Sequence, residues 1–226
     1  MKIVRNSFLC LSLLLVIRLT AVAGGKDGIS TSKDGRQTIA ASPISPFHPL
    51  ESAPLSGLMR LYDNSSKYPL GVYWCCNGYT ISGSASGVGA TFADAMPFTP
   101  SANATVEEIG LAIGFISGTN EITVSLNADN GGVPGTSLGS FNVSNLPTFG
   151  ECCSVELQSV GSGIPVTAGT QYWVVVQTTS PNSDTYAAWN DNVTNQTLQP
   201  FAFWENGTWE ATEGVLGAFA VVGTIP

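Results

Sequence analysis

Basic residues are missing from most of this chain of 226 residues. All eight Lys and Arg lie in the first 67 residues, whereas residues 68–226 contain twelve Asp and Glu and no cation, a formal charge of −12. Such a segment cannot neutralise phosphates, which excludes nucleic-acid binding and docking on anionic lipid. P-loop and kinase-like chemistry are excluded with them, because both need a lysine at the phosphates.

Histidine is almost absent as well. The single one, His48, lies in a Pro- and Ser-rich stretch, residues 42–49, outside the predicted domain. A Ser-His-Asp or Cys-His mechanism needs the imidazole within hydrogen-bond reach of the nucleophile, so we expect neither here. The G-x-S-x-G string at residues 135–139 is interpreted as a coincidence, because it precedes a predicted strand and has no histidine partner.

Long hydrophobic runs are also missing. The apolar run at residues 8–17 follows Lys2 and Arg5 and precedes Ala21-Val22-Ala23, and it is well short of the roughly 20 residues that span a bilayer. This pattern predicts a cleaved signal peptide at residues 1–23 and hence a secreted, extracellular or cell-surface protein. Residues 24–57, rich in Gly, Ser and Pro, predict a flexible arm before a single domain at residues 58–226.

Short stretches with a period of two dominate that domain. Ile122, Val124 and Leu126 alternate with Thr123 and Ser125, so that each set lies on one face of a strand. Residues 172–176 are apolar on both faces, which indicates a central strand that is covered on both sides. Residues 117–120 predict a hairpin loop and residues 129–135 a longer turn. The predicted strands are residues 58–63, 88–92, 108–117, 121–127, 138–143, 153–160, 172–177, 185–189, 201–204 and 215–223. Together they favour an all-β fold, an antiparallel β-sandwich of the jelly-roll type.

Four cysteines remain after signal cleavage, in the adjacent pairs Cys75-Cys76 and Cys152-Cys153. In an exported protein this even count predicts structural disulfides. Antiparallel neighbouring strands would pair 75 with 153 and 76 with 152, parallel strands would pair 75 with 152 and 76 with 153, and two vicinal rings are the third connectivity. A tetrathiolate zinc site is the alternative, although adjacent ligands fit its usual spacing poorly.

Aromatic residues supply the most concrete functional hypothesis. Tyr79, Trp189, Trp204 and Trp209 are candidates for a platform that stacks on sugar rings, whereas Trp173 is predicted to lie in the core because its strand is apolar throughout. Glu205 and Glu210 flank two of these tryptophans. As a pair they give the alternative hypothesis of a glycoside hydrolase, which needs one carboxylic acid and one carboxylate across a cleft.

Two polar loops offer oxygen ligands that suit calcium. Asp129 lies in a Gly-rich turn and Asp191 follows Trp189 between two asparagines. A structural calcium ion is therefore a hypothesis for these residues, beside the interpretation that Asp129 stabilises an Asx-type turn. No other cofactor is predicted.

Several short motifs together resemble a family of secreted bacterial domains. They are Leu-Tyr-Asp-Asn at residues 61–64, Phe-Thr-Pro at 98–100, Leu-Asn-Ala-Asp at 126–129 with Gly-Val-Pro-Gly at 132–135, Ala-Gly-Thr-Gln-Tyr-Trp at 168–173 and Ala-Trp at 188–189. In this order the chain resembles the choice-of-anchor domains, most closely the R type, over roughly residues 59–210. The resemblance implies export and a β-sandwich, and it supplies no catalytic residue. We therefore expect a non-catalytic binding or structural module with a polysaccharide or cell-surface glycan as its partner, with a passive envelope or matrix component as a further alternative.

Overall fold

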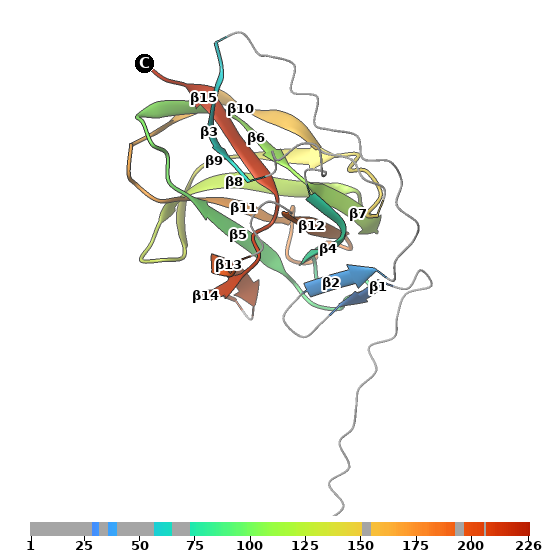
Figure 1. Cartoon of the computed structure of the whole chain (residues 1–226). Helices are drawn as coiled ribbons and strands as arrows, with labels where there is room; N and C mark the ends of the chain where they lie inside the picture. The colour runs from blue at the N-terminus through green and yellow to red at the C-terminus, as the bar shows by residue number, and fades with distance from the viewer. Residues whose placement is uncertain are drawn as a thin grey trace, which may run out of the picture.

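The computed structural model describes residues 29–31, 36–39, 57–64, 73–150, 155–192, 197–205 and 207–226. These residues form three antiparallel sheets and no helix, so the all-β prediction is confirmed (Figure 1). In spatial order, the six-stranded sheet contains β14 (Thr208–Gly214), β13 (Gln199–Glu205), β5 (Ala93–Phe98), β11 (Tyr172–Thr178), β8 (Glu121–Asp129) and β9 (Pro134–Ser144). The five-stranded sheet contains β1 (Ile29–Thr31), β2 (Arg36–Ile39), β4 (Tyr73–Ser82), β12 (Tyr186–Asn192) and β7 (Ile113–Ser117). The four-stranded sheet contains β10 (Val155–Val166), β6 (Ala104–Leu111), β15 (Phe219–Thr224) and β3 (Met59–Asp63).

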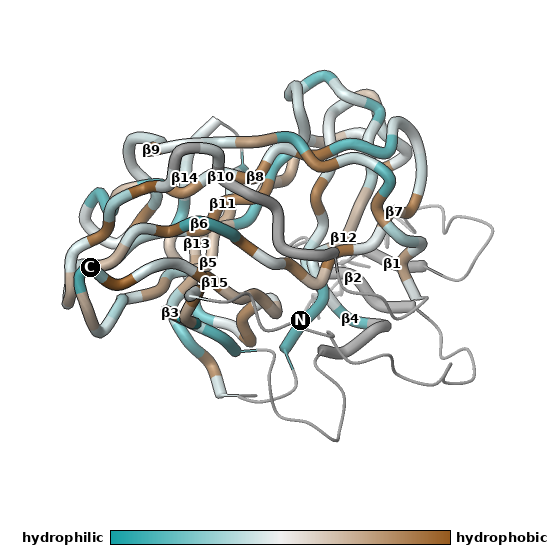
Figure 2. Tube along the Cα trace, turned by 90° about the horizontal axis from the view of Figure 1, so that it is seen from above, coloured by the Kyte–Doolittle hydropathy of each residue, from teal (hydrophilic) through white to brown (hydrophobic). Residues whose placement is uncertain are grey.

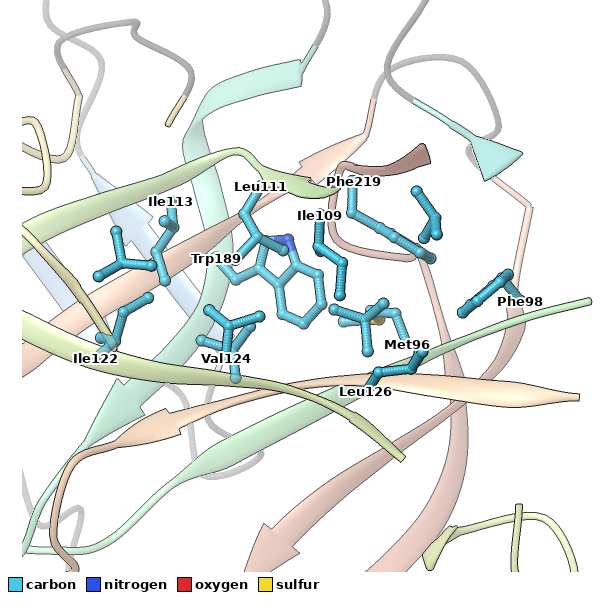
Figure 3. Packing of buried hydrophobic residues seen from close by; sticks show 14 of the residues in the cluster. Met96, Phe98, Ile109, Leu111, Ile113, Ile122, Val124, Leu126, Trp189 and Phe219 are labelled. Atoms are coloured by element: carbon cyan, nitrogen blue, oxygen red, sulfur yellow. The ribbon is translucent and has the colours of Figure 1, made fainter. Parts of the chain in front are cut away.

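The main core lies between the six-stranded sheet and the other two sheets (Figure 3). The predicted alternation on β8 is observed, because Ile122, Val124 and Leu126 are fully buried on its inner face. In Figure 2, hydrophobic and hydrophilic stretches are interspersed along the described part of the chain. Opposite β8 lie apolar side chains of both other sheets: Ile109, Leu111, Ile113, Trp189 and Phe219. This two-layered, sandwich-like arrangement gives the six-stranded sheet an inner face on the core and an outer face away from it.

The five-stranded and four-stranded sheets are joined side by side through Ala112. Its N–H donates to the carbonyl of Ala218, and its carbonyl accepts from the N–H of Asn190. The sequence predicts one strand over residues 108–117, but the chain passes at Ala112 from β6 of one sheet to β7 of the other. The break does not disturb the alternation, because Ile109, Leu111 and Ile113 all remain buried on the core side.

Three details of the predicted strand pattern are wrong. Residues 117–120 are not a hairpin loop, because they connect β7 to β8, which belong to different sheets. Residues 88–92 form the loop before β5, in which only Phe92 makes a bridge, to Ser82. The sequence pattern does not predict the strands β1, β2, β4, β5 and β14. Neither β4 nor β14 alternates clearly in hydrophobicity. The turn at residues 129–135 is confirmed and joins the paired strands β8 and β9.

Candidate functional site

The hairpin of β13 and β14 forms one edge of the six-stranded sheet and carries a pair of tryptophans. Trp204 and Trp209 face each other across the two strands in direct register. Their rings are half-buried and meet edge to face, with centroids 5.5 Å apart and planes at 69°. Gly207 in the connecting turn has a φ of 89°, a left-handed conformation that favours glycine and permits so tight a connection. The predicted hairpin tip between the two tryptophans is therefore confirmed.

A small apolar cluster lies on the outer face of the same sheet, beside this hairpin. Trp209 packs against it from one side and Val133 of the β8–β9 turn from the other. The cluster consists of Ala95, Trp173, Val175 and Ala202, each at most 2 % exposed. The prediction that Trp173 is buried is confirmed, and β11 is covered on both faces as expected. This cluster fixes the Trp209 indole against the sheet.

One row of outward-facing side chains crosses all six strands at the level of the tryptophans. Trp209 is opposite Trp204, which is opposite Ala93. The register of β11 with β5 ends at the pair of Val176 and Asp94, and Gln177 and Ala93 are the next residues beyond that pair on the two strands. On its other side Gln177 pairs with Thr123, the partner of Asn142. Gln177 and Asn142 are exposed, Thr123 is half-buried and Ala93 is buried. We call these six residues the transverse row: Trp209, Trp204, Ala93, Gln177, Thr123 and Asn142.

The structure corrects the prediction for Tyr79 and Trp189, which are buried and present no ring for stacking. Trp189 is fully buried in the core, where its Nε1 donates to the carbonyl of Ala218 at 2.9 Å. Tyr79 is 4 % exposed, and its hydroxyl donates to the carbonyl of Val215 at 2.7 Å. Both rings therefore have their polar atoms paired inside the protein, as buried Tyr and Trp usually do. Of the four candidates for a stacking platform, Trp204 and Trp209 remain.

Asp129 stabilises the β8–β9 turn, which confirms the Asx-turn interpretation. Its carboxylate accepts hydrogen bonds from the backbone N–H groups of Gly131 and Gly132, from Nε2 of Gln171 at 2.9 Å and from Nε1 of Trp173 at 2.7 Å. Desolvation raises the pKa of Asp129, but the hydrogen bonds from Trp173, Gln171 and the two glycines outweigh it, so that the pKa is lowered overall. The turn is thereby fastened to the outer-face cluster through the Trp173 indole.

Asp191, the second residue of the calcium hypothesis, is buried in β12 of the five-stranded sheet and thus belongs to a different sheet from Asp129. Within the described ranges, no three His, Cys, Asp or Glu side chains are grouped so that they could hold a metal ion. A calcium ion at Asp129 would compete with N–H donors for the same oxygens. The calcium hypothesis stays a prediction.

Glu205 and Glu210 lie on the opposite side of the hairpin from the tryptophans. Glu205 neighbours Trp204 along β13, and Glu210 neighbours Trp209 along β14. Since successive side chains of a strand point to opposite faces, a sugar ring stacked on either indole would be separated from both carboxylates by the hairpin itself. The two residue pairs are therefore not parts of one site.

Asp94 is a buried carboxyl group that the sequence reasoning missed. It lies on the inner face of β5 between Phe203 and Val176, and it is 4 % exposed. Desolvation raises the pKa of Asp94 well above its ordinary value. The signal in the sequence is an aspartate inside the otherwise apolar strand Ala-Asp-Ala-Met-Pro-Phe.

The cysteine predictions lie outside the described residues. Cys152 and Cys153 are not among them, and only the backbone of Cys75 and Cys76, in β4, is described. No helix of the described part could span a membrane. Comparisons of the chain with protein-family models, with curated proteins and with solved structures give no match in any of the three.

Proposed function

We propose that this protein is a secreted, non-catalytic module that binds carbohydrate through the outer face of its six-stranded sheet. The observation that carries the proposal is the cross-strand pair of Trp204 and Trp209, half-exposed on an otherwise uncharged part of that face. Indole rings offer a flat apolar surface with a polar edge, which suits the faces of sugar rings. The outer-face cluster holds Trp209 in place, so little side-chain freedom is lost when a ligand binds.

The strand order supports a jelly-roll connectivity as part of this proposal. In a jelly roll two four-stranded sheets face each other, and most successive strands cross from one sheet to the other. Here one sheet contains four neighbouring strands in the order β5, β11, β8 and β9. The opposite layer has the order β4, β12 and β7, and it continues through Ala112 into β6 and its neighbour β10. On this assignment β13 and β14 extend the first sheet beyond β5. The tryptophan hairpin is then an addition to a common scaffold.

The proposed export follows from the N-terminal sequence pattern. The basic, apolar and small-residue parts of residues 1–23 match the order found in signal peptides, and the resemblance to choice-of-anchor domains points the same way. N-terminal sequencing of the protein recovered outside the producing cells checks this, and the expected first residue is Gly24. A retained N-terminus at Met1 would contradict cleavage.

A binding comparison of matched hairpin variants tests the carbohydrate proposal. The full chain, exported to the periplasm of a bacterial host, is compared as wild type, Trp204→Ala, Trp209→Ala and Glu210→Gln on a panel of plant and microbial polysaccharides. We expect saturable binding that each tryptophan variant weakens about tenfold or more, as for a central aromatic contact. Glu210→Gln should leave binding unchanged, because this exposed residue lies on the opposite side of the same hairpin.

The same set of variants distinguishes carbohydrate binding from the two alternative functions, a passive envelope component and a glycoside hydrolase. Near-UV circular dichroism verifies that each variant is folded. Equal binding by both folded tryptophan variants would remove the proposed site, and the absence of any binding would favour a passive envelope component. The non-catalytic assignment would be wrong if the wild type released reducing sugar from a polysaccharide and if Glu205→Gln or Glu210→Gln abolished this release.

A further inference from the structure

We infer that the carbohydrate ligand is an uncharged polysaccharide chain, extended across the strands along the transverse row. The inference rests on the proposed function and adds the class of ligand and the direction in which it lies. Three features of the outer face carry it: the absence of cations, the chemistry of the row, and its length.

The charge of the outer face excludes an acidic ligand. Residues 68–226 contain no Lys or Arg, so a uronate, sulfate or phosphate group on a glycan would find no cation among the side chains of this sheet. The register assigns three carboxylates to the outer face: Asp129 and Glu213 lie at its margins, and Glu121 accepts a hydrogen bond from Nδ2 of Asn142 at 3.4 Å. An anionic polysaccharide would be repelled by these groups, whereas a neutral one would be unaffected.

The chemistry of the transverse row changes from one end to the other. At the hairpin end, Trp204 and Trp209 provide the apolar surface, and the small side chain of Ala93 beside Trp204 is buried and makes no contact with the ligand itself. Beyond Ala93, the amides of Gln177 and Asn142 and the hydroxyl of Thr123 are neutral donors and acceptors, which match the hydroxyl groups of a sugar. The Thr123 hydroxyl donates to Oδ1 of Asn142 at 2.9 Å, so these two side chains are already oriented.

The length of the row requires a chain ligand. Six strands, and therefore five spacings of about 4.8 Å, separate Trp209 from Asn142, which gives roughly 24 Å. A monosaccharide or disaccharide cannot reach both ends. Affinity should therefore increase with chain length until the oligosaccharide reaches Asn142, and then remain constant.

The first part of the test compares neutral and anionic polysaccharides that share a backbone. Hydroxyethylcellulose is paired with carboxymethylcellulose, and methyl-esterified polygalacturonate with the de-esterified form, and binding of the full chain is measured at low and high NaCl. We expect binding to a neutral member, at least tenfold weaker binding to its anionic partner, and no weakening of neutral binding by salt. Equal or tighter binding of the anionic partner would overturn the inference.

The second part uses malto-, cello- and xylo-oligosaccharides from disaccharide to octasaccharide. Gln177→Ala and Asn142→Ala should each weaken octasaccharide binding about three- to tenfold, as expected for the loss of one or two neutral hydrogen bonds, and leave disaccharide binding unchanged. Trp204→Phe should weaken both. Ser137→Ala, an exposed β9 residue outside the row, is the matched control. A bacterial host leaves the N-x-S sequon at Asn142 without a glycan.

The outcomes distinguish the inference from the proposed function. The inference about the transverse row would be wrong if Gln177→Ala and Asn142→Ala both bound the octasaccharide with wild-type affinity while Trp204→Ala lost binding. That result would still support the tryptophan site. No binding of any neutral or anionic probe would overturn the two together.

Discussion

Asp94 and Asp129 show how the position of a carboxyl group in the same sheet decides its role. Asp129 lies at the end of β8, where four N–H groups donate to its oxygens and lower its pKa. Asp94 lies between Phe203 and Val176, where desolvation raises its pKa. Asp129 therefore stabilises the fold when it is ionised, whereas ionised Asp94 destabilises it.

For Asp94 we predict a pH-dependent gain in stability from Asp94→Asn. Because its folded-state pKa lies above the unfolded value of about 3.9, the folded protein binds the proton more tightly, and stability falls as pH rises from about 4 towards the folded pKa. Each pKa unit of difference corresponds to about 1.4 kcal/mol. Asparagine resembles the protonated acid, so urea midpoints of Asp94→Asn should exceed those of the wild type at pH 8 and approach them at pH 3.

Asp184→Asn serves as the control of opposite sign. Hydrogen bonds from Thr119 lower the pKa of Asp184, so its contribution is present above about pH 4 and is lost as the pH falls. That variant should be less stable than the wild type at pH 8. The assigned role of Asp94 would be contradicted if the difference in stability between Asp94→Asn and the wild type did not change with pH.

At the scale of the elements, the close contact between β12 and the segment that precedes β15 requires a glycine at position 217. Gly217 forms a bridge with Asp191, and a Cβ at this position would lie 2.8 Å from both Cε2 and Nε1 of Trp189. The indole is fully buried and cannot move without disturbing the core. We predict that Gly217→Ala destabilises the protein by about 1–3 kcal/mol, as overpacking does.

Chemical denaturation of Gly217→Ala checks this prediction, and Gly87→Ala is the matched control. No atom lies within 4 Å of a Cβ at Gly87, and its φ is not in the left-handed region. The control should therefore unfold within about 0.5 kcal/mol of the wild type. Equal stability of the two variants would mean that the Trp189 indole can be displaced at little cost.

The elements also show what could be predicted from the sequence. Alternation located β8, whose core-facing residues follow a period of two, whereas a continuous apolar run located β11. The same alternation hid the break at Ala112, since Ile109, Leu111 and Ile113 keep their phase across it. Local patterns could not reveal that Trp189 is buried and Trp204 half-exposed, because this depends on which sheets pack together. Nor could they reveal the transverse row, which depends on the register of six strands from distant parts of the chain.

For the whole molecule, the uneven distribution of charge affects stability. Twelve carboxylates without a cation in residues 68–226 repel one another most strongly in the compact state. Added NaCl screens this repulsion within a Debye length of about 10 Å at 0.1 M. We predict that the Tm rises from low to moderate NaCl, as measured by circular dichroism. A falling Tm would indicate instead that attractive pairs with the basic N-terminal residues dominate.

The pairing of β3 with β15 determines how the domain responds to mechanical force. The two strands are antiparallel, and Met59 at the start of β3 pairs with Gly223 near the end of β15. Tension applied to residues 59 and 223 therefore acts on one pair of hydrogen-bonded residues at a time, beginning at this pair. The strands are unzipped from one end and are not sheared along their length. A domain pulled from these two points would begin to open at low force, at the four-stranded sheet, while the six-stranded sheet that carries the tryptophans is still intact.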